Sequence, residues 1–300
     1  GLAYFAEVPA VLVDVQRTGP STGMPTRTQQ SDLTIAAYAS HGDTKHVLLF
    51  PSTPTECFEM TAESFDLADR LQTPIMVMTD LDLGMNDHMC APFTWDDARR
   101  YDRGKVYSAE DLETIKRFGR YLDVDGDGIP YRTIPGVHPT KGAYVVRGTS
   151  RDEYAVYTED SDAYRRNMER LLVKWETAKQ IVPPPQRYQE RNASANGVVF
   201  FGTSTQSAGE ALDILNTTGY RLDALRLRAF PFSQSVADFV AEHDRVFVIE
   251  QNRDGQMRSL LINELQVDPR RLIPILNFDG MPITADAIVR QISQHLTAQQ

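Results

Sequence analysis

Short apolar runs recur along the chain, separated by polar loops and amphipathic stretches. Because strand and helix patterns alternate, the sequence predicts an α/β fold built on parallel sheets. The short, nearly continuous apolar character of the runs is typical of strands covered on both faces. The predicted strands are Val11–Val15, His46–Phe50, Pro74–Thr79, Ala143–Arg147, Gly197–Phe201, Asp223–Arg228, Arg245–Gln251 and Leu272–Asn277.

Amphipathic stretches between these strands predict helices. Ser161–Ile181 is the longest, with Met168 and Trp175 on one apolar stripe. Ser108–Tyr121 begins with Ser-Ala-Glu-Asp, a helix N-cap followed by acidic residues. Gly1–Glu7 resembles the middle of a helix. The remaining predicted helices are Thr61–Leu71, Ser207–Thr217, Gln234–Glu242, Gln256–Leu265 and Thr284–Leu296.

Consecutive prolines at 183–185 divide the chain, because they cannot continue a helix and favour an extended linker. We therefore expect a first domain over residues 1–181, a linker over 182–189 and a compact parallel α/β domain over 190–300. Residues 84–142 form a long insertion rich in Gly, Asp and Pro, which predicts loops on the surface or against a partner.

Composition narrows the functional classes. The chain has 300 residues and a net charge of −10, which argues against a general nucleic-acid binder. Cys57 and Cys90 form no CxxC motif, so we expect idle thiols in a reducing compartment. No apolar run approaches the roughly 20 residues of a membrane span, and no signal peptide is visible. We expect a cytoplasmic protein without a membrane partner, and, since Gly1 is not a methionine, a start that was removed upstream.

The loop from Gln16 to Asp32 follows the first predicted strand and carries the chief candidate site. Its sequence, QRTGPSTGMPTRTQQSD, contains two arginines, many hydroxyls and no acid before its last residue. Loops at the carboxyl ends of strands bind ligands in α/β sheets, and an arginine fork suits a carboxylate or phosphate. The candidate binding residues are Arg17, Thr18, Ser21 and Thr22. Alternatively, the loop is a structural crossing in which Glu7 or Asp14 neutralises Arg17.

Other motifs are weaker. Asp123, Asp125 and Asp127 resemble the start of a calcium loop, but Ile134 stands where a bidentate Glu is needed. They are candidate metal ligands, although an acidic turn is the preferred interpretation.

Two βα turns offer further candidates. Gly202–Ser207 follows a strand and either binds phosphate at a helix N-terminus or caps that helix. Glu250–Gln256 is a functional strand end or a tight turn. Of six scattered histidines His41 is the best site candidate, although a surface turn is favoured. HExxH and GxSxG motifs do not occur.

The longest motifs resemble a known family. QRTGPSTGMPTRTQQSDL, ASHGDTKHVLLFPST, TPIMVMTDLDLGMN and DVDGDGIPYRTIPG are similar to segments of the alpha subunits of 2-oxoacid:ferredoxin oxidoreductases, and to the 2-oxoglutarate type in particular. Towards the C-terminus, FGTSTQSAGEALD, LRLRAFPF and VIEQNRDGQM resemble the transketolase-C-terminal-like domain of the same proteins. The resemblance covers nearly the whole chain.

This resemblance implies a fold and an activity. It implies a pyrimidine-binding domain of the thiamine diphosphate type, incomplete at its N-terminus, followed by the transketolase-C-terminal-like domain. Such enzymes decarboxylate a 2-oxoacid oxidatively, form an acyl-coenzyme A and reduce ferredoxin. Thiamine diphosphate with Mg²⁺ is implied at the interface with a beta subunit, which carries a [4Fe–4S] cluster. The cysteine content of this chain agrees with a cluster held elsewhere.

By motif position, Arg17 corresponds to the arginine that holds the substrate carboxylate in the family, with Thr18 beside it. The glutamate that activates the cofactor is implied to lie upstream of residue 1, so no catalytic or cofactor-binding residue is assigned. Arg151 stands where the family carries a histidine. Alternatives are the same chemistry on pyruvate, a branched-chain or an aryl oxoacid, a noncatalytic assembly subunit, and a separate nucleotide-binding protein.

Overall fold

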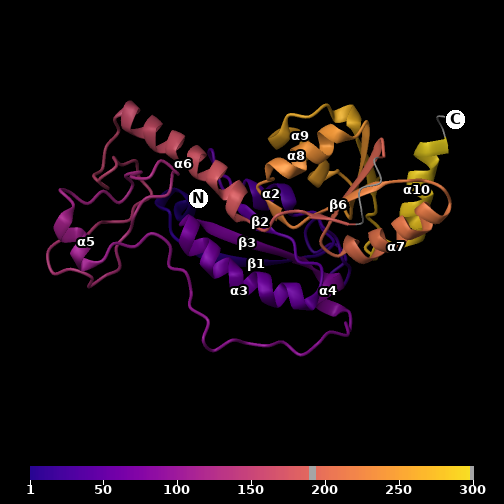
Figure 1. The fold of residues 1–300 in the computed structure, drawn as a ribbon, viewed down its shortest axis with the longest axis horizontal. Helices are drawn as coiled ribbons and strands as arrows, with labels where there is room; N and C mark the ends of the chain where they lie inside the picture. Colours follow the sequence, from indigo (N-terminus) through magenta and orange to yellow (C-terminus); the bar gives the residue numbers. More distant parts are fainter. Residues whose placement is uncertain (189–193, 298–300) are drawn as a thin grey trace.

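The computed structural model describes residues 1–188 and 194–297, which form two β-sheets flanked by helices (Figure 1). The expected linker end at 189 and the start of the second domain at 190 lie outside the described residues. The first sheet has the order β1-β3-β2-β7. β1, β3 and β2 are parallel, and β7 is antiparallel to β2. Its strands are β1 (Ala10–Gln16), β2 (Val47–Leu49), β3 (Pro74–Asp80) and β7 (Ala229–Phe230).

The second sheet has the order β4-β6-β5-β8-β9, and its antiparallel edge strand is β4. Side chains alternate along β5: Val198 and Phe200 pack against α7 and α10, whereas Val199 and Phe201 face the core that includes α8 and α9. The strands are β4 (Gln186–Arg187), β5 (Asn196–Phe201), β6 (Asp223–Leu227), β8 (Arg245–Glu250) and β9 (Leu272–Leu276). The helices are α7 (Ser204–Thr217), α8 (Gln234–Glu242), α9 (Gln256–Leu265) and α10 (Ala285–Thr297), and the 3-10 helix η1 (Pro269–Arg271) precedes β9.

The long helix α3 (Pro54–Leu71) covers one face of the first sheet and contacts β1, β3 and α6 (Figure 1). Thr53 caps it by accepting a hydrogen bond from Glu56 N, and Pro54 occupies the first turn. The other helices in this part of the chain are α1 (Leu2–Ala6), α2 (Leu33–Ala37), α4 (Leu81–Met85), α5 (Ala109–Thr114) and α6 (Ser161–Ile181). Among the described residues, no helix is long and apolar enough to cross a membrane.

The structure confirms the α/β class and most of the predicted elements. The bounds of α6, α8 and α9 are as predicted. α3 begins well before the predicted Thr61, and α5 ends at Thr114 instead of continuing to Tyr121. The predicted strand Ala143–Arg147 is wrong, because this extended segment pairs with no strand among the described residues. β1 is not covered on both faces, since it is an edge strand with Leu12, Val13 and Val15 exposed.

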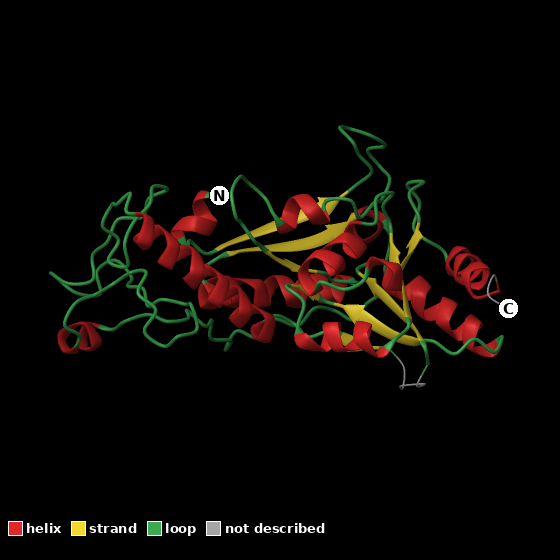
Figure 2. Ribbon diagram, turned by 90° about the horizontal axis from the view of Figure 1, so that it is seen from above, coloured by secondary structure: helices red, strands yellow, loops and turns green. Residues whose placement is uncertain are grey.

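The predicted insertion has two parts. After α4 the chain runs along α3 as an extended strap, where Phe93 stacks on Phe58 with ring centroids 5.0 Å apart. Arg99 fastens the strap through Asp66, with a nitrogen–oxygen distance of 2.9 Å. The chain then forms a loop-rich lobe around α5 at one end of the molecule, seen at the left of Figure 2.

The segment LRLRAFPF, residues 225–232, joins the two sheets. It leaves the second sheet at β6 and adds β7 to the edge of the first, where Leu49 pairs with Ala229. Phe230 packs against Trp175 of α6 at a centroid distance of 5.3 Å. Arg226 is buried and ion-paired with Glu56 in the first turn of α3. The hydrophobic core therefore runs continuously from one sheet to the other.

Candidate functional site

The strands β1, β3 and β2 are parallel, so their carboxyl ends lie on the same side of the first sheet. The loop after β1 starts there. The loop folds back on itself, because Thr18 N donates to Arg27 O at 2.9 Å. Its far side is tied to the second sheet, where Gln30 N donates to Gln251 O at 2.8 Å. Gly23 is required within it, since a Cβ there meets Thr18 O at 2.2 Å and φ is +49°. The loop is thus a fixed structure.

The predicted binding residues differ in how freely they present their side chains. Arg17 is exposed, and no described residue forms a hydrogen bond or an ion pair with its guanidinium. Ser21 and Thr22 are exposed on the same loop. Thr18 is buried, with its Oγ1 3.1 Å from Arg27 O and 3.2 Å from Thr28 O, so its hydroxyl hydrogen is used inside the loop.

The alternative in which Glu7 or Asp14 neutralises Arg17 is wrong. Glu7 is fully buried and pairs instead with Arg170 and Lys174, each at 2.8 Å. Within the described part of the chain, Arg17 is therefore an unpaired, planar cation at the carboxyl end of β1.

A buried polar junction links this loop to the second sheet. Asp80, at the end of β3, accepts hydrogen bonds from Thr203 Oγ1 at 2.6 Å and Gln30 Nε2 at 3.3 Å. Gln251 Nε2 donates to Thr203 Oγ1 and Ser204 Oγ. Burial raises the pKa of Asp80 despite these donors. The junction fixes the loop against both sheets.

Buried side chains in both weaker βα turns form structural hydrogen bonds. Thr203 and Ser204 are buried and bonded within the polar junction, so the phosphate-binding interpretation of Gly202–Ser207 is not supported. Glu250 is fully buried and accepts hydrogen bonds from Met257 N and Arg258 N, which caps α9. His41 lies exposed in a surface turn.

Lys105 forms ion pairs with Asp125 and Asp127 in the acidic turn that was a candidate metal site. Asp123 accepts from Gly126 N and Gly128 N, each at 2.9 Å. Lys105 Nζ lies 2.6 Å from Asp125 Oδ2 and 2.8 Å from Asp127 Oδ1. The ammonium group thus takes the position between the carboxylates that a metal needs, and no group of metal-ligating side chains occurs among the described residues.

A pair of carboxyl groups beside the candidate loop was not predicted. Asp14 and Gln16 share one face of β1, and Gln16 Oε1 accepts from Asp32 N at 3.2 Å. Burial, and then the Asp32 carboxylate, raise the pKa of Asp14 to about 6. Burial also raises the pKa of Asp32. In the sequence, this pair was indicated only by the position of Asp14 inside the apolar run that forms β1.

We predict that Asp14→Asn stabilises the chain at pH 7 and not at pH 4. The folded-state pKa of Asp14, about 6, lies above the ordinary value of 3.8, so the folded state binds the carboxyl proton more tightly than the unfolded state. The free energy of unfolding therefore falls as pH rises from 3.8 through 6 and the Asp14 carboxyl ionises. The group is half exposed, so screening reduces the expected gain to about 1 kcal/mol. Denaturant unfolding at both pH values measures it, with Asp286→Asn on the exposed face of α10 as control. An equal effect at pH 4 and pH 7 contradicts the prediction.

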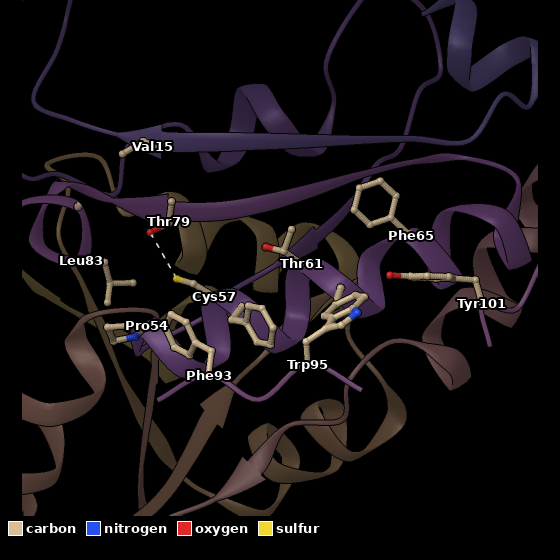
Figure 3. Close-up of a pocket in the computed structure, with 13 residues that line it drawn as sticks. Val15, Pro54, Cys57, Thr61, Phe65, Thr79, Leu83, Phe93, Trp95 and Tyr101 are labelled. Atoms are coloured by element: carbon tan, nitrogen blue, oxygen red, sulfur yellow. Dashed lines mark hydrogen bonds between the residues drawn. The ribbon is translucent and has the colours of Figure 1, made fainter. Parts of the chain in front are cut away.

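An apolar cavity of about 620 Å³ opens beside the carboxyl ends of β1 and β3 (Figure 3). Val15 and Thr79 line its strand side, and the aromatic rings of the strap and of α3 line the rest. The half-buried Cys57 also lines it, with Sγ 4.0 Å from Thr79 Oγ1. Burial raises the pKa of this thiol, so it is a neutral lining group.

A second, polar cavity of about 430 Å³ lies against the loop. Thr18, Gly19 and Asp32 line it from the loop, and Asn252 and Arg253 line it from the turn after β8. The loop that carries Arg17 therefore forms one wall of a polar cavity.

Several known proteins are similar to this chain in sequence. Residues 1–100 match the family described as pyruvate flavodoxin/ferredoxin oxidoreductase, thiamine diphosphate-binding. The chain is 30% identical over 288 residues to subunit alpha of 2-oxoacid:ferredoxin oxidoreductase 2 from Aeropyrum pernix, covering 94% of this chain and 43% of the relative. It is 28% identical over 266 residues to the 2-oxoglutarate synthase subunit KorA of Methanothermobacter marburgensis, covering 86% and 66%.

The fold is shared with a solved enzyme structure. The 2-oxoglutarate:ferredoxin oxidoreductase from Magnetococcus marinus, bound to 2-oxoglutarate, coenzyme A and succinyl-CoA, superposes with a TM-score of 0.86 at 23% identity. The superposition covers 99% of this chain and 50% of that one.

The fold and the matched residues define the class as that of the thiamine diphosphate-binding α/β oxidoreductases. Within it, the chain belongs to the family of 2-oxoacid:ferredoxin oxidoreductase alpha subunits, as the sequence motifs predicted. The chain spans less than half the length of the Aeropyrum relative.

Proposed function

We propose that the protein of which this chain is a part oxidises a 2-oxoacid, with 2-oxoglutarate as the preferred substrate, to an acyl-coenzyme A and CO₂. A beta subunit would hold the [4Fe–4S] cluster that supplies electron transfer to ferredoxin. The observation that carries the proposal is Arg17, a free guanidinium on a fixed loop at the carboxyl edge of the first sheet. The KorA relatives support 2-oxoglutarate as substrate.

In this proposal Arg17 binds a substrate carboxylate through two parallel N–H donors. Ser21 and Thr22 present hydroxyls from the same loop, while Thr18 supports the loop from inside. The loop is anchored on both sheets, so the carboxylate is oriented without ordering the chain first. Water exclusion by a partner surface then favours the loss of charge as CO₂.

The residues at this edge fit one half of thiamine diphosphate. Aromatic and aliphatic side chains of the apolar cavity suit the flat faces of its rings. No group of metal-ligating side chains for a Mg²⁺-diphosphate occurs among the described residues. In the proposal the beta subunit brings the diphosphate half. When bound, the cofactor supplies the stabilised carbanion that decarboxylation needs.

The test is reconstitution of the full-length alpha subunit with its beta subunit. We expect ferredoxin reduction that requires a 2-oxoacid, coenzyme A and thiamine diphosphate, with 2-oxoglutarate giving the highest kcat/KM among 2-oxoglutarate, pyruvate, a branched-chain oxoacid and an aryl pyruvate. A different best substrate overturns the 2-oxoglutarate assignment and keeps the reaction. Assembly without turnover of any of them overturns the reaction and favours a noncatalytic assembly subunit.

A further inference from the structure

Residues 143–147 of the lobe, AYVVR, have the composition of a strand and no neighbouring strand. They contain no helix, turn or bend. Their backbone N–H and C=O groups form no hydrogen bond with any described residue. We call these residues the unpaired segment. A row of free backbone groups is a template for pairing with a strand of another chain.

The unpaired segment exposes apolar side chains to solvent. Val145 is 61% exposed and Val146 is 43% exposed. Tyr144 contacts the lobe, where its ring centroid lies 5.9 Å from that of Phe118. β-Branched and aromatic residues of this kind pack well on a pleated, half-buried surface. Exposed apolar groups beside free backbone groups therefore indicate a site of strand addition.

The lobe holds the unpaired segment in place. Thr133 Oγ1 donates to Gly142 O at 2.6 Å, directly before the segment. A Cβ at Gly142 would meet Thr133 Cγ2 at 2.8 Å, and φ there is +79°, so this close approach requires glycine. Arg120 Cζ lies 5.4 Å from the centroid of the Tyr144 ring. A segment that is already ordered loses little conformational entropy when it pairs.

The apolar residues of the segment are complementary to themselves. In an antiparallel pair of two copies with a two-fold axis at Val145, Tyr144 of each copy lies opposite Val146 of the other. Each is an aromatic and β-branched cross-strand pair, which stabilises a sheet. Tyr144 and Val146 share one face of the segment and line a cavity of about 390 Å³ together with Ile134 and Val137. The two pairs therefore form on the hollowed side of the lobe.

The charges also permit this pairing. In the same register Ala143 lies opposite Arg147, and the preceding Lys141 lies opposite Thr149. No like charges are directly opposite each other, which would destabilise a sheet. A register shifted to place the axis at Tyr144 would instead bring Lys141 opposite Arg147. The sequence thus favours a second copy of the chain, in one register, as the occupant.

We propose that residues 143–147 of two copies of the protein pair as antiparallel strands about a two-fold axis at Val145, and so join two lobes into a dimer. In Figure 1 the lobe around α5 and the helix α4, which follows the carboxyl end of β3, lie at opposite ends of the first sheet. The contact therefore lies away from the candidate loop. Five residues on each side are fewer than the roughly 20 of a standard interface, so the Kd should be micromolar.

Sedimentation equilibrium of the full-length protein measures this association. Val145→Asp places two carboxylates opposite each other at the axis, and Val145→Lys places two ammonium groups there, so each should raise the dimer Kd at least tenfold. Mixing the two variants should restore a dimer, because opposite charges then face each other. Val173→Asp, at an exposed position of α6, should associate like the unmodified protein.

Several outcomes overturn the proposal. One is a monomer at about 200 μM, well above a micromolar Kd. Another is a dimer that both Val145 variants retain. A third is a Val145→Asp variant that loses its beta subunit and keeps its self-association, which would make the beta subunit the source of the second strand.

Amide hydrogen exchange of the unmodified protein provides a measurement that does not depend on whether a variant folds. Backbone amides within residues 143–147 should exchange at least tenfold more slowly at concentrations where the dimer forms than in dilute solution. Equal exchange rates at the two concentrations contradict strand pairing at this segment.

Discussion

Replacing Arg17 by alanine is expected to raise the KM of the reconstituted enzyme for its 2-oxoacid about hundredfold. The charge-assisted hydrogen bonds of a guanidinium to a carboxylate contribute on the order of 1.5–3 kcal/mol, and a hundredfold change corresponds to about 2.7 kcal/mol. Arg17 is exposed and has no partner within residues 1–188 and 194–297, so the melting temperature should not change. Steady-state kinetics with 2-oxoglutarate and thermal unfolding measure the two effects.

Two variants separate this role from a general effect of charge. Arg17→Lys keeps the charge and loses the planar fork, so it should give an intermediate KM. Arg27→Ala removes the other arginine of the loop, whose Nη1 donates to Thr26 O, and should change KM little. If Arg17→Ala and Arg27→Ala raise KM equally, the loop attracts anions through its charge and Arg17 is not the carboxylate ligand.

Local signals in the sequence predict much of the fold. The bounds of α6 follow from its apolar stripe and from the prolines after it. The true start of α3 was also written locally, in Thr53 as N-cap, Pro54 in the first turn and Glu56 after it. The predicted start at Thr61 is later, because Thr61 and Ser64 also have the spacing of a helix N-terminus.

Elements that depend on distant partners could not be predicted. Ala143–Arg147 has the composition of a strand, but strand formation requires a neighbour to pair with. β7 is the opposite case, because two residues form a strand only where β2 offers them an edge. Two α/β domains are therefore expected from the sequence. The strand β7, which joins the two sheets, is not.

The candidate site shows the same division. Arg17 was selected from a local feature, because it directly follows the apolar run that forms β1. The hydrogen bonding of the Thr18 hydroxyl inside the loop was not predictable, because it depends on how the loop folds back onto Arg27 and Thr28. The raised pKa of Asp14 depends on burial and on Asp32, which is distant in sequence.

Replacing Glu7 by alanine is expected to destabilise the folded chain by about 3–5 kcal/mol, the range for breaking a buried ion pair by removing one partner. The loss leaves Arg170, Lys174 and Arg120 without the carboxylate that they share. Burial alone raises the pKa of Glu7, but these cations outweigh it and lower the pKa to about 2. Denaturant unfolding of the full-length protein measures the change.

The dependence on pH follows from that shift. The folded pKa lies below the ordinary value of 4.5, so the contribution of Glu7 is complete above about pH 4.5 and is lost as pH falls towards 2. Glu7→Gln should lack this part of the acid limb, and Glu169→Ala, exposed on α6, should retain it. Because the cations repel one another, adding Lys174→Met to Glu7→Gln should recover stability. Additive losses in the double variant would mean that packing around Glu7, rather than its charge, holds α6 in place.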